Sequence, residues 1–140
     1  MFRFAILALL VFGQTAAASA AAGCTGADPA ILSVAVKDMT PVGAVNHYAL
    51  SGTVVNVGSV AQAPDVLQFV DIYKGGVKLD SRGIPPLSAG QSYTFAYDSS
   101  RSSEAGAGST VLRFALDGGA QATPGSVDCD RANGQYMLRF

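Results

Sequence analysis

The stretch from Tyr48 to Gly58 has the strongest strand character in the chain. Tyr48, Leu50 and Val54 alternate with small or polar residues, which is the period-two pattern of a strand with one buried face. Asn56 and Gly58 end this pattern, because both residue types tolerate the left-handed backbone of a turn. The stretch therefore predicts a half-buried strand that runs into a turn.

Residues 1–22 have the order of a secretory signal peptide. Arg3 precedes an apolar run over residues 4–12, and a tract of small residues follows up to Gly23. The apolar run is much shorter than the ~20 residues of a spanning helix, so we expect no transmembrane segment in the mature chain. Residues 23–140 are then expected to form one periplasmic or secreted domain.

Two cysteines, Cys24 and Cys129, stand near the two ends of this domain. In an oxidising compartment an even number of cysteines favours a disulfide bond, and two cysteines allow only one pairing. A lipoprotein anchored through Cys24 is the alternative, because residues 21–24 end like a lipobox. Ala21 stands where a lipobox usually has a large aliphatic residue, which favours simple secretion.

The charge balance is mild. Removing Arg3 from the nine basic residues leaves eight, against ten acidic residues, and the basic residues form no cluster in the sequence. Nucleic acid and anionic membranes are therefore not expected as partners.

Six further stretches carry strand or turn signals, and no stretch of the mature chain predicts a helix. Seven strands in about 118 residues favour an all-β fold, an antiparallel immunoglobulin-like β-sandwich of about seven strands. Gly75 and Gly76 predict a tight hairpin, residues 38–46 a connection, residues 99–109 a polar loop rich in serine and glycine, and residues 118–134 a long loop. The further strands are expected at Ile31–Lys37, Val66–Lys74, Val77–Ser81, Ser92–Asp98, Thr110–Asp117 and Gln135–Phe140.

Alternation within these strands predicts which residues are buried. In the third strand Asp71 shares a face with Leu67 and Phe69, so this face is expected to point outward; a central strand or a bulge would also explain its mixed pattern. The predicted buried sets are Leu32, Val34 and Val36; Val66, Val70 and Ile72; Tyr93, Phe95 and Tyr97; Leu112, Phe114 and Leu116; and Tyr136, Leu138 and Phe140.

The order of these landmarks resembles CARDB, a family of bacterial cell-adhesion-related immunoglobulin-like domains. Val54–Gly58 resembles the Val-x-Asn-x-Gly element of its second strand, and Leu87–Gln91 resembles its Leu-x-x-Gly-Gln turn. The terminal Glu and paired Asn of the family are not found, and the cysteine pair is not part of its pattern. The resemblance covers nearly the whole mature chain and implies an immunoglobulin-like accessory module. Further similar landmarks are Asp28–Val36, Ile72–Gly76, Asp117 and Asp128–Asn133.

The sequence lacks the arrangements that carry catalysis. His47 is the only histidine, and no nucleophile elbow, zinc-ligand spacing or phosphate-binding glycine loop is present. We therefore expect no enzymatic activity and no cofactor, with His47 at the surface or a strand edge. A small enzyme with an unrecognised site remains the alternative.

The loop before the last strand is the candidate binding site. Asp128, Asp130 and Asn133 place three oxygen-bearing side chains close together, and Asp117 could lie nearby. Such ligands suit calcium, but the spacing misses the EF-hand pattern and lacks its final Glu. A solvated loop held by Cys129 is favoured over a metal site, and a small calcium-binding protein remains an alternative.

These observations predict a non-catalytic binding or structural module of the bacterial envelope, for protein–protein or adhesion-type interactions. The partner would be an envelope or extracellular protein or glycan. An exposed edge strand suits this role, because a sandwich can add a strand of its partner through main-chain hydrogen bonds. The alternation of Tyr136, Leu138 and Phe140 also resembles an outer-membrane sorting signal, but the strand count favours an ordinary last strand of a sandwich.

Overall fold

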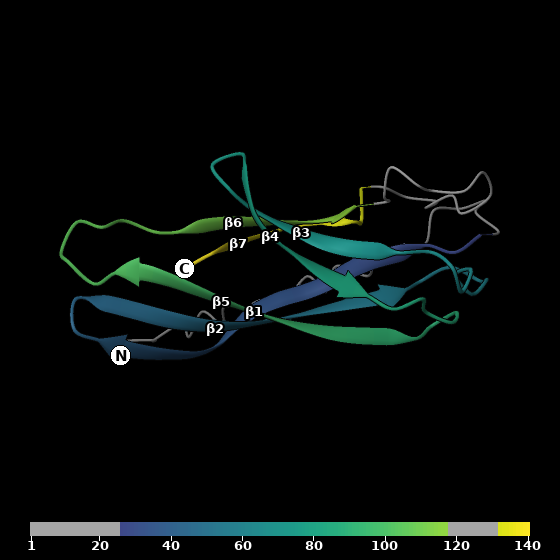
Figure 1. The fold of residues 1–140 in the computed structure, drawn as a ribbon, viewed down its shortest axis with the longest axis horizontal. Helices are drawn as coiled ribbons and strands as arrows, with labels where there is room; N and C mark the ends of the chain where they lie inside the picture. Colours follow the sequence, from purple (N-terminus) through teal and green to yellow (C-terminus); the bar gives the residue numbers. More distant parts are fainter. Residues whose placement is uncertain (1–25, 118–131) are drawn as a thin grey trace, which may run out of the picture.

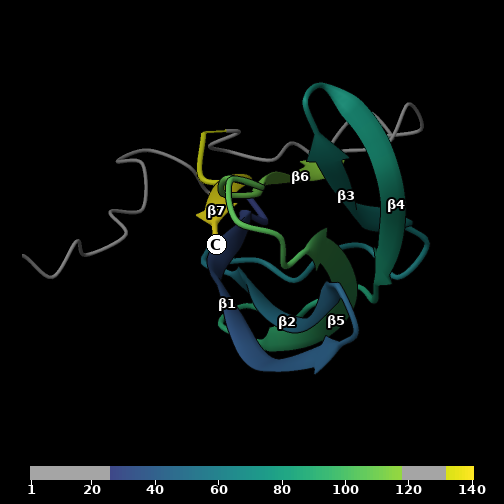
Figure 2. The same cartoon turned by 90° about the vertical axis from the view of Figure 1, so that its left-hand side faces the viewer.

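The computed structural model describes residues 26–117 and 132–140, and these form two antiparallel sheets (Figure 1). One sheet has three strands in the order β1-β2-β5, and the other has four in the order β4-β3-β6-β7. Figure 2 shows the two layers from one end of the molecule. This confirms the predicted antiparallel β-sandwich. The strands are β1 (Pro29–Val42), β2 (Val45–Asn56), β3 (Gln68–Lys74), β4 (Val77–Ile84), β5 (Ser92–Ser102), β6 (Val111–Asp117) and β7 (Gln135–Arg139).

The core lies between the two sheets and is built from alternate residues of their strands. Both sheets contribute fully buried side chains, and the rings of Phe95 and Phe114 meet across the core with centroids 6.0 Å apart. Burying such side chains is the main favourable term in folding, at about 1.5–3 kcal/mol each. The buried cluster comprises Ile31, Val34, Tyr48, Leu50, Val54, Val70, Ile72, Ile84, Leu87, Phe95, Leu112 and Phe114.

Strand β2 has the predicted buried face. Tyr48, Leu50 and Val54 are all less than 10 % exposed. Gly52 occupies the same row, and a Cβ at this position would collide with the ring of Phe95 on the neighbouring strand. The glycine is therefore needed because the aromatic ring fills the place of its side chain.

Strand β1 is longer than predicted, and its buried face differs. Its pairing with β2 shifts register between Ile31 and Ser33 and again between Val36 and Asp38. Leu32 is the extra residue of the first shift and is 57 % exposed, and this shift reverses the alternation, so that Ile31 and Val34 are both buried. The prediction that Leu32 points inward is wrong. Val36 is on the inner face, since it pairs with the buried Leu50, but it is 37 % exposed.

The predicted connection over residues 38–46 is also wrong. These residues extend β1 and β2 into a tight hairpin, in which Val42 pairs with Val45 and Gly43 has a φ of 58°. Pro41 had indicated a loop. A proline is tolerated here because β1 is at the edge of its sheet and can do without one donor.

Strand β3 buries Val70 and Ile72 and exposes Phe69, as predicted. The strand itself begins at Gln68, so Val66 precedes it. Asp71 is on the outward face but only 4 % exposed, for a reason given below. The hairpin between β3 and β4 is confirmed.

That hairpin has positive φ at both glycines, 56° at Gly75 and 81° at Gly76. These values match a primed turn, which suits the right-handed twist of two paired strands. Strand β4 then continues to Ile84, three residues beyond the predicted end at Ser81.

Strand β5 also runs further than predicted, to Ser102. Phe95 is buried and Tyr97 packs against the core, but Tyr93 is 38 % exposed, so the expectation of three core aromatics is wrong for Tyr93. In β6, Leu112 and Phe114 are fully buried. The last residues of the chain follow their predicted pattern, with partly buried Tyr136, Leu138 and Phe140 packed against the core.

Candidate functional site

Asn56, the central residue of the Val-x-Asn-x-Gly element, joins three segments at one end of the sandwich. Its side chain is fully buried. The Oδ1 atom accepts hydrogen bonds from the main-chain N–H groups of Asp28 (2.9 Å) and Gly58 (3.0 Å). The Nδ2 atom donates to the main-chain oxygens of Val60 (2.8 Å) and Leu87 (3.1 Å). The amide is used completely, so its role is structural.

Gly58 belongs to the same arrangement. A Cβ at this position would collide with the main-chain oxygen of Gly26 and lie 2.6 Å from the main-chain N of Asp28. The two segments can approach so closely only because residue 58 has no side chain. The element therefore fixes the start of β1 against the end of β2 and leaves no group free for a ligand.

The predicted acidic site lies mostly outside the described residues. Asp128 and Asp130 are outside them, as is the Cys24–Cys129 pair. Asp117 ends β6, opposite Phe69 of β3. No cluster of three or more histidine, cysteine or acidic residues that could hold a metal ion occurs within residues 26–117 and 132–140.

Asn133 is described, and it joins β7 to β1. Its Nδ2 atom donates to Asp28 Oδ1 at 3.0 Å, and its main-chain oxygen accepts from the N–H of Ile31 at 3.0 Å. Its Oδ1 atom is buried and has no hydrogen-bond partner in the part of the chain that the structure describes. The Nδ2 group of Asn133 thus holds the start of β1 in place, while its Oδ1 atom does not contribute.

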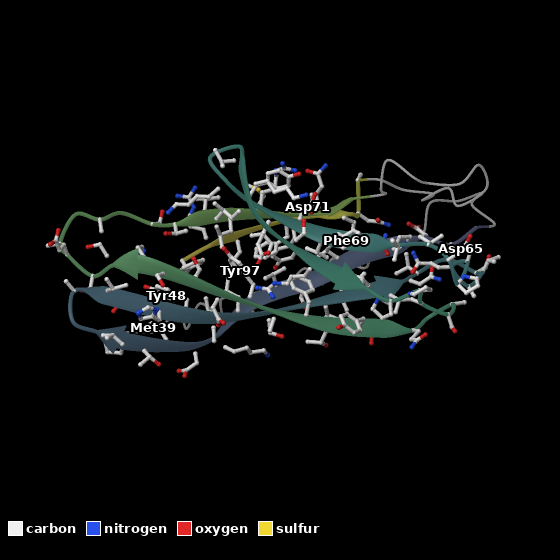
Figure 3. All side chains as sticks on the ribbon, in the orientation of Figure 1. Met39, Tyr48, Asp65, Phe69, Asp71 and Tyr97 are labelled. Atoms are coloured by element: carbon white, nitrogen blue, oxygen red, sulfur yellow. The ribbon has the colours of Figure 1, made fainter. Side chains whose placement is uncertain are left out.

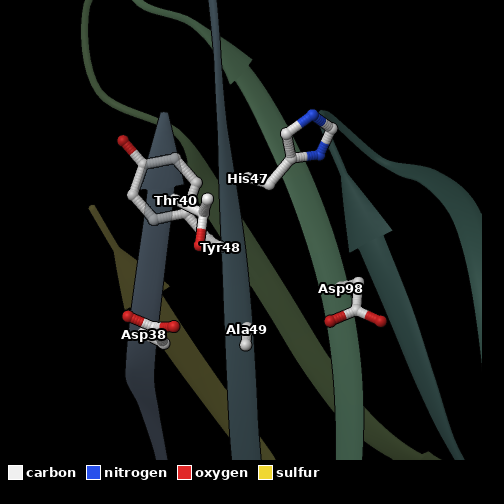
Figure 4. A pocket seen from close by; sticks show the side chains of 6 residues that line it. All are labelled: Asp38, Thr40, His47, Tyr48, Ala49 and Asp98. Carbon is white, nitrogen blue, oxygen red and sulfur yellow. The ribbon is translucent and has the colours of Figure 1, made fainter. Parts of the chain in front are cut away.

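A hollow lies on the outer face of the three-stranded sheet (Figure 4). Its volume is about 360 Å³. Ala49 is at its floor, paired with Asp38 on one side and Asp98 on the other, so two carboxylates flank a methyl group. The hollow is lined by Asp38, Thr40, His47, Tyr48, Ala49 and Asp98.

His47 and Ser100 stand one row further along this face. His47 is exposed, as expected, and its Nδ1 atom is 2.9 Å from Ser100 Oγ. A serine beside a histidine can form a nucleophile and base, but catalysis also needs a group that orients the base and donors for an oxyanion. Among the described residues no carboxylate is hydrogen-bonded to His47, and the pair lies on an open sheet surface. The described residues therefore do not assemble a catalytic triad around this pair.

The outer face of the four-stranded sheet carries an ion pair between the buried Asp71, labelled near Phe69 in Figure 3, and the exposed Lys78. Asp71 accepts hydrogen bonds from Lys78 Nζ (2.9 Å), from the Tyr73 hydroxyl (3.4 Å) and from Ser81 Oγ. Burial acts to raise the pKa of Asp71, but the hydrogen bonds from Ser81 and Lys78 outweigh it, so this pKa lies below its usual 3.8. The bonds explain how an outward carboxylate can be buried.

Tyr97 closes the open side of the sandwich between β4 and β5. The Arg82 guanidinium lies 5.8 Å from the centre of its ring, and Arg82 forms an ion pair with Asp80 at 2.7 Å. Burial, together with the negative charge of Asp80, raises the pKa of Tyr97. Strand β4 thus approaches the edge of β5 at this residue.

Arg101 fixes the C-terminal end of β5. Its Nη1 atom donates to the main-chain oxygens of Gly108 (2.8 Å) and Phe140 (2.9 Å), and Nη2 donates to the Tyr48 hydroxyl (3.0 Å). The guanidinium carbon is 5.6 Å from the centre of the Tyr48 ring. The end of β5 is thereby held to β2 and to the end of the chain.

Comparison with known proteins gives a match in structure alone. No family model matches the sequence. No curated protein matches it either. The fold is similar to the CARDB domain of a Pyrococcus furiosus protein, determined in complex with di-metal ions, with a TM-score of 0.59 and 15 % identity. The match covers 83 % of this chain and 93 % of that chain. The fold is therefore CARDB-like.

No helix of the described residues is long and apolar enough to cross a membrane. Two surfaces were not predicted from the sequence, the free edge of β5 and the hollow over Ala49. The strand lengths and the pairing of Asp38, Ala49 and Asp98 across three strands create them, and neither can be derived from alternation within one strand.

Proposed function

We propose that this chain is a non-catalytic protein-binding module of the bacterial envelope, which binds an extended polypeptide segment along the edge of β5. The CARDB-like fold supports a binding role by analogy with accessory immunoglobulin-like modules. The observation that carries the proposal is the exposed edge of β5, since main-chain groups at a sheet edge can pair with a further strand.

The four edge strands differ in how well they are protected. Strand β1 has two register shifts and Pro41, β4 has a register shift near Lys78, and β7 has only five residues. Bulges, lysines, prolines and short length all discourage pairing with another chain. Strand β5 has eleven residues, pairs with β2 without a shift, and contains no lysine or proline. It is the edge best suited to strand addition.

The hydrogen bonds that flank β5 show which of its groups face outward. Asn56 N–H donates to the oxygen of Gln91, and Ser103 N–H donates to the oxygen of Ala44. Because antiparallel bonding alternates, the odd-numbered residues of β5 face β2, and the even-numbered residues direct their main-chain groups away from it. Beyond the crossing with β4 at Tyr97, the free residues are Asp98, Ser100 and Ser102 (Figure 1).

This edge is also rigid. Arg101 alternates with the free residues and is bonded to Tyr48, Gly108 and Phe140. A partner strand would therefore bind an edge that is already ordered, which reduces the entropy lost on binding.

A peptide selected from a displayed random library against the mature domain tests the proposal. Ser100→Pro removes one outward N–H without removing a bond to β2, whereas Ser100→Ala removes the same hydroxyl and keeps the N–H. We expect the peptide to bind Ser100→Pro at least about ten-fold more weakly than wild type, and Ser100→Ala within about two-fold. Equal binding to all three proteins would place the peptide on another surface.

We further propose secretion after cleavage near Gly23 and a Cys24–Cys129 disulfide. Asp28 and Asn133 each follow one of these cysteines by four residues, and their side chains are hydrogen-bonded at 3.0 Å. This contact supports a bridge between the segments that precede β1 and β7, because a disulfide needs Cα atoms within about 7 Å. Intact-mass measurement before and after thiol alkylation tests both points. Two alkylated thiols in the native protein, or a lipid adduct on Cys24, would contradict them.

The predicted acidic site remains a second proposal, for a cation or polar partner at Asp128, Asp130 and Asn133, with Asp117 as a weaker candidate. The bond from Asn133 to Asp28 means that replacing Asn133 would also disturb the fold. The informative variant is therefore Asp128→Ala with Asp130→Ala. Isothermal titration calorimetry with calcium should give a binding heat for wild type and none for this double variant. No binding heat in either protein would contradict a calcium site.

A further inference from the structure

The outer face of the four-stranded sheet carries two arginines beside the Asp71–Lys78 ion pair, and the outer face of the three-stranded sheet carries two aspartates. On the four-stranded sheet, Arg113 of β6 is paired with Tyr73 of β3 and with Met137 of β7. Arg139 is paired with Val111, which makes it a diagonal neighbour of Arg113 across β6 and β7. The alternate residues Leu112 and Phe114 are buried, so these arginines are on the outer face. We call Arg113, Arg139, Tyr73 and Met137 the arginine patch.

Neither arginine of this patch has a carboxylate partner within residues 26–117 and 132–140. The Arg113 guanidinium is held 4.1 Å from the centre of the Tyr73 ring, and Arg139 Nη1 donates only to Ser109 Oγ at 3.3 Å. The nearby carboxylate of Asp71 is occupied by Lys78 and Ser81. A stacked guanidinium keeps its N–H donors available for an oxyanion, so the patch is prepared to bind carboxylates.

The outer face of the three-stranded sheet carries the opposite charge to the arginine patch. Asp38 and Asp98 flank the hollow over Ala49, two strand spacings or about 10 Å apart. No ion pair involves either carboxylate among the residues described here. The adjoining row is formed by Ala35, Ser51 and Ala96, so the surface beside the hollow is flat. We call Asp38, Ala49 and Asp98 with this hollow the acidic hollow.

We propose that a second copy of this chain docks its arginine patch onto the acidic hollow. Arg113 and Arg139 would pair with Asp98 and Asp38, and the exposed Met137 (61 %) would cover the alanines beside the hollow. The two surfaces differ, so the contact is heterologous and leaves one patch and one hollow free at the ends of each pair. Such contacts build linear stacks of copies rather than closed dimers.

The expected association is weak. A face three strands wide and about ten residues long covers about 500 Å², so one contact buries about 1,000 Å² in total, at the lower limit of specific interfaces. Exposed ion pairs are screened by salt. We therefore expect stacking at high protein concentration and low ionic strength, which suits a surface protein that is crowded at its site of action.

Sedimentation velocity with charge-reversal variants tests the proposal. Variant one is Arg113→Glu with Arg139→Glu, and variant two is Asp38→Lys with Asp98→Lys. Wild type should show concentration-dependent oligomers in about 50 mM salt that dissociate in about 500 mM salt. Each variant alone should associate at least about ten-fold more weakly, because its two faces now carry the same sign. An equimolar mixture of the two variants should regain association, since every face then meets an opposite charge.

The control for variant one is Lys74→Glu, a charge reversal of the same kind at an exposed residue of the β3–β4 hairpin outside both surfaces. This control should associate like wild type, and all variants should keep the thermal midpoint of wild type within a few degrees. A wild-type protein that stays monomeric at about 1 mM in low salt overturns the proposal, and so does a variant mixture that stays monomeric. The two proposals share Asp98 but are distinguished by variant one, because Arg113 and Arg139 are on the other sheet and their replacement should leave peptide binding at β5 unchanged.

Discussion

At the scale of single residues, Asn56 holds one end of the sandwich together through four hydrogen bonds to the main chain. It satisfies two donors and two acceptors of the main chain in three separate segments. The sequence predicted that Asn56 ends a strand, and this is correct. It could not show the four bonds, because Asp28 and Leu87 are brought to Asn56 only by the folded sheets.

Asn56→Ala should therefore destabilise the domain strongly. It would leave the main-chain N–H groups of Asp28 and Gly58 and the main-chain oxygen of Val60 without these partners, at about 1–3 kcal/mol for each group that water cannot reach, while the oxygen of Leu87 keeps its bond from the N–H of Gln62. We expect a loss of about 3–5 kcal/mol in the free energy of unfolding, measured by urea denaturation. A loss below about 1 kcal/mol would show that the amide is not central to this end of the sandwich.

Asp71 gives a prediction for pH. Its pKa is lower in the folded protein than in the unfolded chain, because the hydrogen bonds from Ser81 and Lys78 outweigh the effect of burial. Its stabilising contribution is thus present above the unfolded value of about 3.8 and is lost as the pH falls through the lower folded value. Asp71→Asn should lose about 1–2 kcal/mol at pH 7 and should show a flatter decline in stability below pH 4 than wild type. Parallel pH profiles for the two proteins would contradict this account.

At the scale of elements, alternation predicted the core of β2, β6 and β7 correctly but failed at Leu32 of β1. The reason is that a register shift depends on the partner strand, and the sequence of β1 carries no sign that Leu32 and Lys37 are extra residues in its pairing with β2. Strand ends were equally hard to place. Residues 99–102 are polar and indicated a loop, yet Arg101 holds them in β5 through bonds to distant residues.

Replacing Arg101 tests whether this side chain holds residues 99–102 in β5. Lysine at this position would keep the charge but could not bond Gly108, Phe140 and the Tyr48 hydroxyl together, because it lacks the planar fork of donors. Arg101→Lys should lower the free energy of unfolding by about 1–2 kcal/mol. It should also speed amide exchange of Thr110 and Phe140, whose main-chain groups bond each other at 2.7 and 3.0 Å. Unchanged exchange at both residues would remove Arg101 from this role.

At the scale of the whole molecule, Arg113 and Arg139 are on the outer face of one sheet, and Asp38 and Asp98 are on the outer face of the other. The sequence has no basic cluster, because Arg113 and Arg139 come from different strands and are brought together by the pairing of β6 with β7. Asp38 and Asp98 are likewise sixty residues apart in the chain and share one hollow. Composition predicted a nearly neutral protein, and this is compatible with two faces of opposite sign.

The central claim is that β5 offers a free edge to a partner strand, and amide hydrogen exchange followed by NMR tests it most directly. In the free domain the amides of Asp98, Ser100 and Ser102 should exchange fast, while those of the odd-numbered residues between them, bonded to β2, exchange slowly. Adding the selected peptide should slow the exchange of the even-numbered amides specifically. Even-numbered amides that are already protected in the free domain, or that stay unprotected when the peptide is bound, would contradict the claim.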